Sequence, residues 1–335
     1  MNNIKKIGLS ALAGSLAVTS ANAFDYTVSG GATLAYSSVD APALAESVNG
    51  KGIGLATDLT LAGNGELDNG YTVDWFMALD TNGAVSNTSG TLALGMGSLG
   101  TLQWNNKFGS KANGIDDVMP AAYNETWDGL STADSNPSFF GSATSQGSID
   151  YRAPAFEMSG LTANLAFTYD MSANEGPATK GGVGTTSVAG KAVVLELSHE
   201  SGLSVGAGQE EVDDGGVNGG DEESVTAYIK YAMGPITVGY QEAYQNTGNG
   251  GQDLEAEFIG IAYTAGDLSV SYGESTKTSH AIGATTSVDT DLESIQAAYT
   301  MGAMTVSAAM SETSNAGNVA NQTHEENEIA VSFAF

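Results

Sequence analysis

Carboxylates gather in two segments of this sequence, and the first has the composition of a calcium-binding loop. Residues 213–223 read DDGGVNGGDEE, with acidic side chains at Asp213, Asp214, Asp221, Glu222 and Glu223. Ca²⁺ takes roughly six to eight oxygen ligands, often from such loops. The spacing departs from the EF-hand, whose ligands alternate along the loop. Two interpretations stay open, a calcium site and a solvated acidic loop, and the sequence requires no cofactor.

The second acidic segment is longer and lies among basic residues. In residues 107–145 and just beyond them, the charged candidates are Asp116, Asp117, Glu125, Asp128, Asp134, Lys107, Lys111 and Arg152. Catalysis by paired carboxylates needs two groups whose surroundings separate their pKa values, and no pair here stands out in that way. The zinc-protease pattern His-Glu-x-x-His and the phosphate-binding Gly-Lys-Ser/Thr do not occur in the sequence. The sequence therefore predicts a protein that is not an enzyme.

Net charge restricts the partners of the chain. Its 335 residues include ten Lys and Arg against 39 Asp and Glu, for a net charge of −29. Such a chain is excluded as a nucleic-acid binder, because phosphate binding needs clustered basic residues. The field of so many carboxylates favours cations, either as permeating solutes or as bridging ions. The chain has no cysteine, so an exported form must be stabilised by a buried core or a closed sheet.

The first 23 residues have the features of a cleaved signal peptide. Lys5 and Lys6 precede a weakly apolar stretch, residues 7–18, and Ala21 and Ala23 form an A-x-A cleavage signal. The stretch is too short and too rich in small residues to span a bilayer as a helix. We expect residues 1–23 to be removed and residues 24–335 to form the mature domain.

After residue 24 the hydropathy pattern has a period of two, which is typical of strands with one apolar and one polar face. In residues 161–169 (LTANLAFTY), for example, the odd positions are apolar or aromatic. Sixteen such segments are predicted as strands, at residues 25–36, 51–63, 69–80, 90–96, 99–106, 146–154, 160–170, 190–199, 202–210, 222–233, 235–245, 252–265, 267–276, 288–300, 302–312 and 326–335. An even number of strands is expected of a bacterial single-chain membrane barrel.

The connections between these strands alternate between long and short. The short ones are tight turns that contain Gly202, Gly234, Gly266 or Gly302, and glycine supplies the positive φ that such hairpins need. The long ones are rich in Gly, Asn, Ser, Asp and Thr, and cover residues 37–50, 81–89, 107–145, 171–189, 211–221, 246–251, 277–287 and 313–325. Short turns on one rim and long loops on the other predict an all-β transmembrane barrel of sixteen antiparallel strands, with periplasmic turns and extracellular loops. A soluble sandwich has no reason to keep this alternation.

Several stretches resemble Gram-negative outer-membrane proteins, and the general diffusion porins among them. The last residues alternate polar side chains with Ile329, Val331, Phe333 and Phe335, like the C-terminal strand that the barrel assembly machinery recognises. Residues 99–104 (LGTLQW), 148–154 (SIDYRAP) and 159–162 (SGLT) are similar to porin segments in the same order. This resemblance spans essentially the whole mature chain and implies a homotrimer of sixteen-stranded pores in the outer membrane.

The resemblance also implies a role for the acidic segment 107–145. In the porin family the third long loop folds inward and narrows the channel, and its acidic residues face basic residues on the opposite wall. This sequence departs from that pattern, because Arg152 is its only arginine and its lysines are scattered. The available basic candidates are Lys107, Lys111, Arg152, Lys191 and Lys230. We therefore expect an acidic constriction that prefers cations, as rings of Asp and Glu do in cation channels.

Two other functions remain open from the sequence. The first is a non-conducting surface barrel, an adhesin or structural protein with acidic and calcium-binding loops, in which the 107–145 loop would project outward. The second is a secreted calcium-binding β protein, although the repeats of that class, of the form Gly-Gly-x-Gly-x-Asp, do not occur. Besides further copies of itself, the expected partners are outer-membrane lipid, lipopolysaccharide and the barrel assembly machinery.

Overall fold

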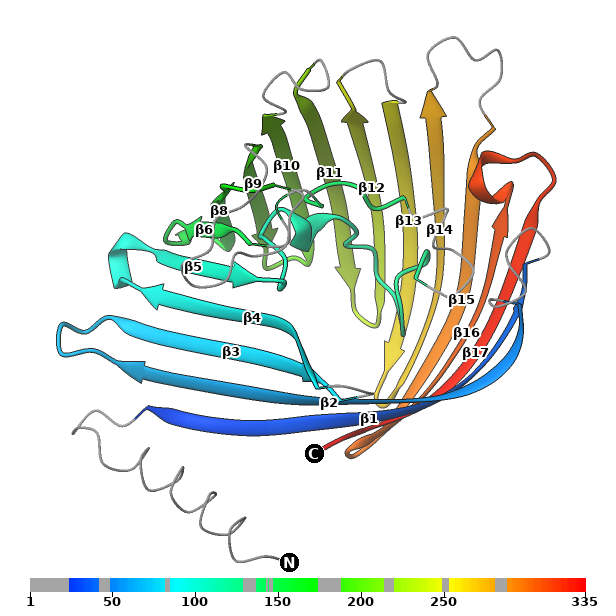
Figure 1. The fold of residues 1–335 in the computed structure, drawn as a ribbon, viewed down its shortest axis with the longest axis horizontal. Helices are drawn as coiled ribbons and strands as arrows, with labels where there is room; N and C mark the ends of the chain where they lie inside the picture. The colour runs from blue at the N-terminus through cyan, green and yellow to red at the C-terminus, as the bar shows by residue number, and fades with distance from the viewer. Residues whose placement is uncertain are drawn as a thin grey trace, which may run out of the picture.

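The computed structural model describes residues 24–41, 49–81, 85–128, 137–142, 144, 147–173, 188–213, 220–248, 253–280 and 288–335, and most of these residues lie in β-strands (Figure 1). The strands are β1 (Asp25–Asp40), β2 (Gly50–Glu66), β3 (Thr72–Asp80), β4 (Ser86–Gly95), β5 (Thr101–Asn106), β6 (Ile149–Arg152), β7 (Phe156–Met158), β8 (Leu161–Asp170), β9 (Ala189–His199), β10 (Leu203–Asp213), β11 (Glu222–Met233), β12 (Ile236–Asn246), β13 (Asp253–Ala265), β14 (Leu268–His280), β15 (Thr290–Met301), β16 (Met304–Ser314) and β17 (Thr323–Ala334). In this part of the chain no helix is long and apolar enough to cross a bilayer.

The strands form one antiparallel sheet that closes on itself. Neighbouring strands in the sequence pair with each other, and β1 pairs with both β2 and β17. β6 and β7 both pair with β8 and form one strand of the barrel, interrupted around Pro154, which has no N–H to donate to the ladder. The seventeen segments therefore make sixteen barrel strands. The predicted fold class is confirmed, and the pairing of β1 with β17 closes the sheet into a barrel.

The observed strand bounds differ from the predicted ones mainly on the rim of the long loops. β1 runs to Asp40 and β14 to His280, beyond the predicted ends at residues 36 and 276. The polar end of β14 still pairs with β13, with Thr278 opposite Glu255. Apolar alternation stops where the wall leaves the apolar environment, whereas the hydrogen-bonded ladder continues. Hydropathy alone therefore placed these ends too early.

The tight turns have the predicted chemistry. Gly266 and Gly302, in the turns that follow β13 and β15, have φ values of 59° and 63°. This left-handed conformation is strained for residues with a Cβ. One connection departs from the expected alternation, because β4 begins at Ser86 and leaves a connection from β3 that is as short as a turn.

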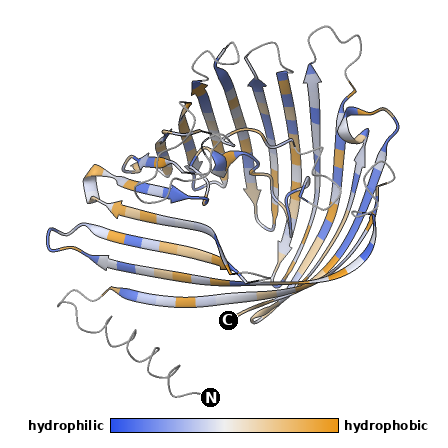
Figure 2. Ribbon diagram, viewed as in Figure 1, coloured by the Kyte–Doolittle hydropathy of each residue, from blue (hydrophilic) through white to orange (hydrophobic). Residues whose placement is uncertain are grey.

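Contacts with the 107–144 segment identify the inner face of the barrel. Gln241 of β12 and Gln296 of β15 both bind that segment, so their side chains point inward. Alternation along each strand and the pairing register extend this assignment to the other strands. The opposite face carries exposed apolar side chains such as Ile259, Ile261 and Tyr263 of β13. Figure 2 shows hydrophilic and hydrophobic residues alternating along the strands, as expected for a wall between lipid and water.

The apolar core lies inside the barrel, between the inner wall and the 107–144 segment. One buried cluster joins Ala112, Ile115 and Phe140 of that segment to Val194 of β9 and Tyr228 of β11. A second cluster contains Phe139, Ala243, Ala256 and Phe258, with Trp127 packed against it. These contacts fix the segment against the wall.

Candidate pore constriction

The 107–144 segment enters the barrel after β5, where the Lys111 amide donates to Asp150 of β6 at 3.1 Å, and it is next fixed on β12. The side-chain oxygen of Gln241 accepts a hydrogen bond from the Val118 amide at 3.0 Å. Its Nε2 donates to the carbonyl oxygens of Ile115 and Asp116, at 2.8 and 3.0 Å. Gln241 is fully buried, and one side chain thus satisfies three backbone groups of the loop.

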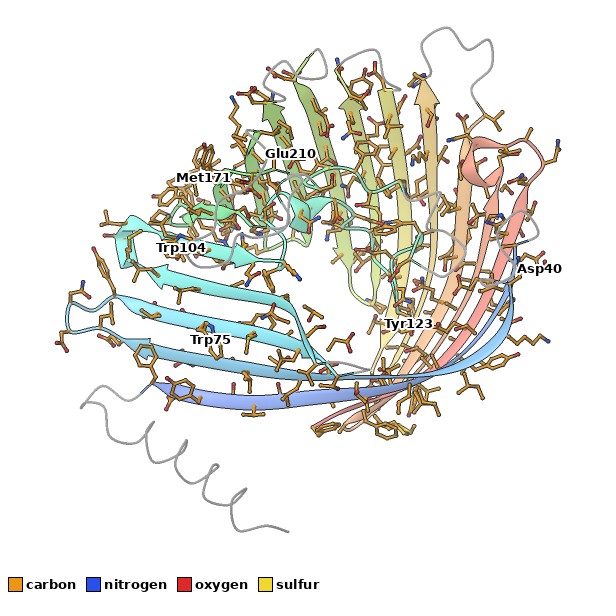
Figure 3. The ribbon with its side chains drawn as sticks, in the orientation of Figure 1. Asp40, Trp75, Trp104, Tyr123, Met171 and Glu210 are labelled. Atoms are coloured by element: carbon orange, nitrogen blue, oxygen red, sulfur yellow. The ribbon has the colours of Figure 1, made fainter. Side chains whose placement is uncertain are left out.

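The middle of the segment is fixed on β14, β15 and β17. The Ala122 amide donates to Ser271 Oγ at 2.8 Å, and the Tyr123 amide donates to Gln296 Oε1 at 2.9 Å. The Tyr123 hydroxyl donates to Glu328 of β17 at 2.6 Å. In Figure 3 Tyr123 lies inside the ring of strands, on the side of β14 and β15. The loop therefore runs along a large part of the inner wall.

The returning part of the segment is held by Glu210 of β10. The Glu210 carboxylate accepts hydrogen bonds from the Gly141 amide at 2.9 Å, from the Thr144 amide at 3.1 Å and from the Thr144 hydroxyl at 2.8 Å. Only 1% of Glu210 is exposed. The sequence did not single out this residue, although its place on the inner side of a strand follows from the alternation.

Four of the predicted carboxylates, Asp116, Asp117, Glu125 and Asp128, come together on the described part of the loop; the fifth, Asp134, lies outside the described residues. Asp116 accepts a hydrogen bond from Ser138 Oγ at 2.8 Å, and Asp117 accepts one from Trp127 Nε1 at 3.1 Å. Burial raises the pKa of all four groups above the ordinary value. For Glu125 burial, reinforced by the charges of Asp116, Asp117 and Asp128, raises the pKa to about 8.

This shift predicts a selectivity change in the alkaline range. Glu125 is mostly protonated below its folded-state pKa of about 8, and its negative charge appears as the pH rises through that value. We expect the preference for K⁺ over Cl⁻, measured as a reversal potential in a KCl gradient, to increase between about pH 7 and pH 9. The variant Glu125→Gln should lack this step. Identical pH profiles for the wild type and the variant would contradict the assignment.

The wall of β1–β5, away from the loop anchors, carries carboxylates as well. Because Ser37 shares Glu328 with the loop, it points inward, and the pairing register extends this direction to Asp58 of β2. Asp58 stands opposite Asp80 of β3, and Asp74 lies on the same face of β3. The one basic residue on β1–β5 is Lys51, which pairs with Ser38 and faces outward. The described residues of this wall thus provide no inward-facing cation.

The basic candidates Lys111, Arg152 and Lys107 do not form a positively charged wall opposite the loop. Lys111 of the loop forms an ion pair with Glu196 of β9 at 2.9 Å, and Arg152 of β6 lies 3.7 Å from the fully buried Asp150. Lys107 begins the loop with a φ of 57° and is exposed.

The remaining two lysines lie on opposite faces of the barrel wall. Lys230 faces inward over the ring of Tyr228, at 5.5 Å. Lys191 instead faces outward and pairs with Glu211 at 2.8 Å, so it is not a constriction residue as the sequence suggested. Hydropathy alternation could not show the outward direction of Lys191, because a lysine at the end of a strand can lie on either face.

The acidic segment 213–223 is only partly described, since Asp214 lies outside the described residues. Asp213 ends β10, Asp221 precedes β11, and Glu222 and Glu223 begin β11 on opposite faces of the sheet. Glu222 accepts a hydrogen bond from Gln245 Nε2 at 2.8 Å. Among the described residues no group of three or more acidic, His or Cys side chains is placed to hold a metal ion. Calcium binding stays a prediction.

One hydrolase-like pattern has no matching structure. Residues 202–206 (GLSVG) fit the Gly-x-Ser-x-Gly pattern, whose serine sits at a sharp turn between a strand and a helix. Ser204 instead lies within β10 and pairs with Ser198 and Lys230 in the neighbouring strands. This serine is a wall residue of the barrel.

The C-terminal residues complete the ring. Ile329, Val331 and Phe333 lie on the outer face of β17, paired with Tyr36, Leu34 and Ala32 of β1. The backbone of Phe335 exchanges two hydrogen bonds with Gly30, at 2.7 and 2.9 Å. The segment that resembles an assembly signal is therefore also the strand that closes the barrel.

Comparisons with known proteins agree with this architecture. Residues 8–281 match the family model described as Gram-negative porin, whereas none of the curated proteins compared with the chain matches it. The solved structures that resemble it include a loop-deletion mutant of OmpT, an outer membrane protein of Vibrio cholerae, with 12% identity, a TM-score of 0.65 and coverage of 93% of this chain and 99% of the other.

Two further structures cover 93% of this chain and all of the other. They are the anion-selective porin from Comamonas acidovorans, at 15% identity and a TM-score of 0.62, and a mutant of the Rh. blastica porin, at 16% identity and a TM-score of 0.60. At such low sequence identities the structural similarity shows only the fold, whereas the match to the family model shows the family to which the chain belongs. The chain therefore belongs to the Gram-negative porin family, and its fold is that of an outer-membrane channel.

Proposed function

We propose that this channel passes small hydrophilic solutes by diffusion and prefers cations over anions. The carrying observation is that the described residues of β1–β5 present Asp58, Asp74 and Asp80 to the interior and include no inward-facing cation. The loop carries four further acidic groups, Asp116, Asp117, Glu125 and Asp128, whose negative charge grows as the pH rises because burial raises their pKa values.

The described basic groups of the interior offset only part of this charge. Lys111 and Arg152 lie within 4 Å of carboxylates, at 2.9 and 3.7 Å, and the pairs are almost neutral at a distance. Lys230 and Lys277 also face the interior, but they stand on β11 and β14, away from the wall that carries Asp58, Asp74 and Asp80. Interior carboxylates concentrate cations and exclude anions, most strongly at low ionic strength, because salt screens their field beyond about 10 Å at 0.1 M.

A planar-bilayer recording tests the proposal directly. We expect the purified protein to give stepwise conductance. In a KCl gradient, the reversal potential should have the sign expected for a channel that prefers K⁺ over Cl⁻. The preference should weaken as the salt concentration rises, because the fixed charges are then screened. A reversal potential of the sign expected for Cl⁻ preference would overturn the cation preference but would not contradict the channel function. Absence of conductance steps would overturn the diffusion function itself.

The surface-barrel alternative is not supported. It required the 107–145 loop to project outward, whereas the described residues of this loop bind β10, β12 and β15 from the inside. For its partners we propose a homotrimer, lipopolysaccharide at the outer surface and the barrel assembly machinery at the C-terminal strand. One structure similar to this chain is described as the trimer form of OmpT from Vibrio cholerae, which supports self-association.

A further inference from the structure

Three glycines stand directly opposite one another on adjacent strands of the inner wall. Gly239 of β12 pairs with Gly260 of β13, which in turn pairs with Gly273 of β14. They face inward, because Gln241 and Ser271 lie two positions along the same strands and bind the loop. Without side chains, they leave a recess across three strands, here named the glycine recess.

Backbone conformation does not explain these residues. None of the three has a positive φ, so each backbone is accessible to any residue. Glycine within a strand weakens the strand and often marks a place where another part of the chain approaches closely. The close approach of the loop is therefore the physical reason for glycine here.

The loop occupies the glycine recess. A Cβ on Gly260 would lie 2.9 Å from Pro120 Cδ and 3.0 Å from Met119 Cβ, and a Cβ on Gly273 would lie 2.1 Å from Thr126 Oγ1. On Gly239 it would lie 2.9 Å from Met119 Sδ. Non-bonded carbon atoms are most stable at about 3.5–4.0 Å, so side chains at these positions would displace the loop toward the interior.

We propose that the glycine recess sets the bore of the channel. It lets residues 119–126 sit one side-chain layer deeper in the wall than they otherwise could, and so keeps the loop from narrowing the path further. The three glycines are positioning residues that determine size selectivity through the loop. This inference rests on the channel function, which the bilayer recording of the wild-type protein tests separately.

The variant Gly273→Ala tests the recess. The new methyl group should push the loop inward by roughly 1.4 Å, the shift that turns the 2.1 Å approach to Thr126 Oγ1 into an ordinary contact. We expect the single-channel conductance to fall roughly 1.5-fold, with a smaller exclusion limit for polyethylene glycols. Adding Thr126→Ala removes the conflicting hydroxyl and should restore both values. A simple loss of barrel stability would not be repaired in this way.

Two further variants complete the experiment. Gly260→Ala faces the rigid ring of Pro120, which has no alternative rotamer, and should lower the conductance at least as much as Gly273→Ala. Gly54→Ala is the matched control, because Gly54 also faces the interior, opposite Ala35, and a Cβ there meets nothing within 4 Å. Heat-modified electrophoretic mobility verifies folding of each variant. Wild-type conductance in both recess variants, or a loss in Gly273→Ala that Thr126→Ala does not restore, would overturn the proposal.

Discussion

Replacing Glu210 with alanine is expected to free the returning part of the constriction loop from the wall. The change leaves the amides of Gly141 and Thr144 without their acceptor, whereas the Thr144 hydroxyl keeps Ser110 Oγ and the Gly141 carbonyl oxygen as partners. Each buried group that loses its partner costs about 1–3 kcal/mol, so docking of this part of the loop should weaken by about 2 kcal/mol or more. We expect noisier conductance with larger open levels, and faster protease cleavage within residues 107–145 of the detergent-purified barrel.

The neighbouring position provides a matched control for Glu210→Ala. Glu211 points to the outer face, where it pairs with the exposed Lys191 at 2.8 Å. Exposed ion pairs contribute about 0–1 kcal/mol, so Glu211→Gln should leave conductance and protease resistance nearly unchanged. Glu210→Gln keeps one side-chain acceptor and should be intermediate. Equal behaviour of Glu210→Ala and Glu211→Gln would show that the loop is held without Glu210.

Removing the charge of the β2–β3 wall should abolish most of the cation preference. The triple variant Asp58→Asn, Asp74→Asn, Asp80→Asn removes three inward carboxylates without changing side-chain size. Charge-lined clefts change local ion concentrations by about tenfold or more, so we expect the K⁺ to Cl⁻ permeability ratio in a KCl gradient to fall several-fold toward one. Replacing the same three residues with lysine should invert the sign of the reversal potential.

The control for the wall charges removes as many carboxylates from the outer face. Glu257, Glu293 and Glu312 face outward on β13, β15 and β16, with Glu293 directly opposite Glu312. Glutamine at these three positions changes the net charge equally but leaves the interior unchanged. If both triple variants shifted the reversal potential to the same extent, the preference would come from the overall charge of the protein and not from the wall.

Alternation and loop length were sufficient to predict the barrel. Both are local properties of a strand that separates lipid from water, and the predicted order of strands matches the structure except for β7. The hydrogen-bonded ends of β1 and β14 could not be predicted, because residues there are polar on both faces and the sequence shows no alternation of apolar and polar side chains. The interruption at Pro154 was visible in the sequence, but the resumption of pairing at Phe156 depends on β8, a partner that local pattern cannot reveal.

The candidate site was predicted only in part. The inward loop and its carboxylates followed from resemblance, and the structure brings Asp116, Asp117, Glu125 and Asp128 together. The anchors Glu210 and Gln241, and the Asp58 wall, were missed, because a strand pattern separates two faces without saying which one meets the loop. Lys191 was misplaced for the same reason. The inward direction of the Asp58 side chain follows only from the strand pairing, in which Ser37 of β1 lies opposite both Glu328 of β17 and Gly52 of β2.

The buried clusters between the loop and the inner wall form in water, whereas the outer wall of the barrel is in contact with lipid. The outer wall is stabilised in lipid, where apolar contact between protein segments gains little over contact with acyl chains. Ile115, Phe140 and Trp127 instead leave water when the loop docks, so this step has the heat-capacity and denaturant dependence of a small soluble domain. We therefore expect the loop to be released in a transition of its own, at urea concentrations and temperatures that leave the strands intact.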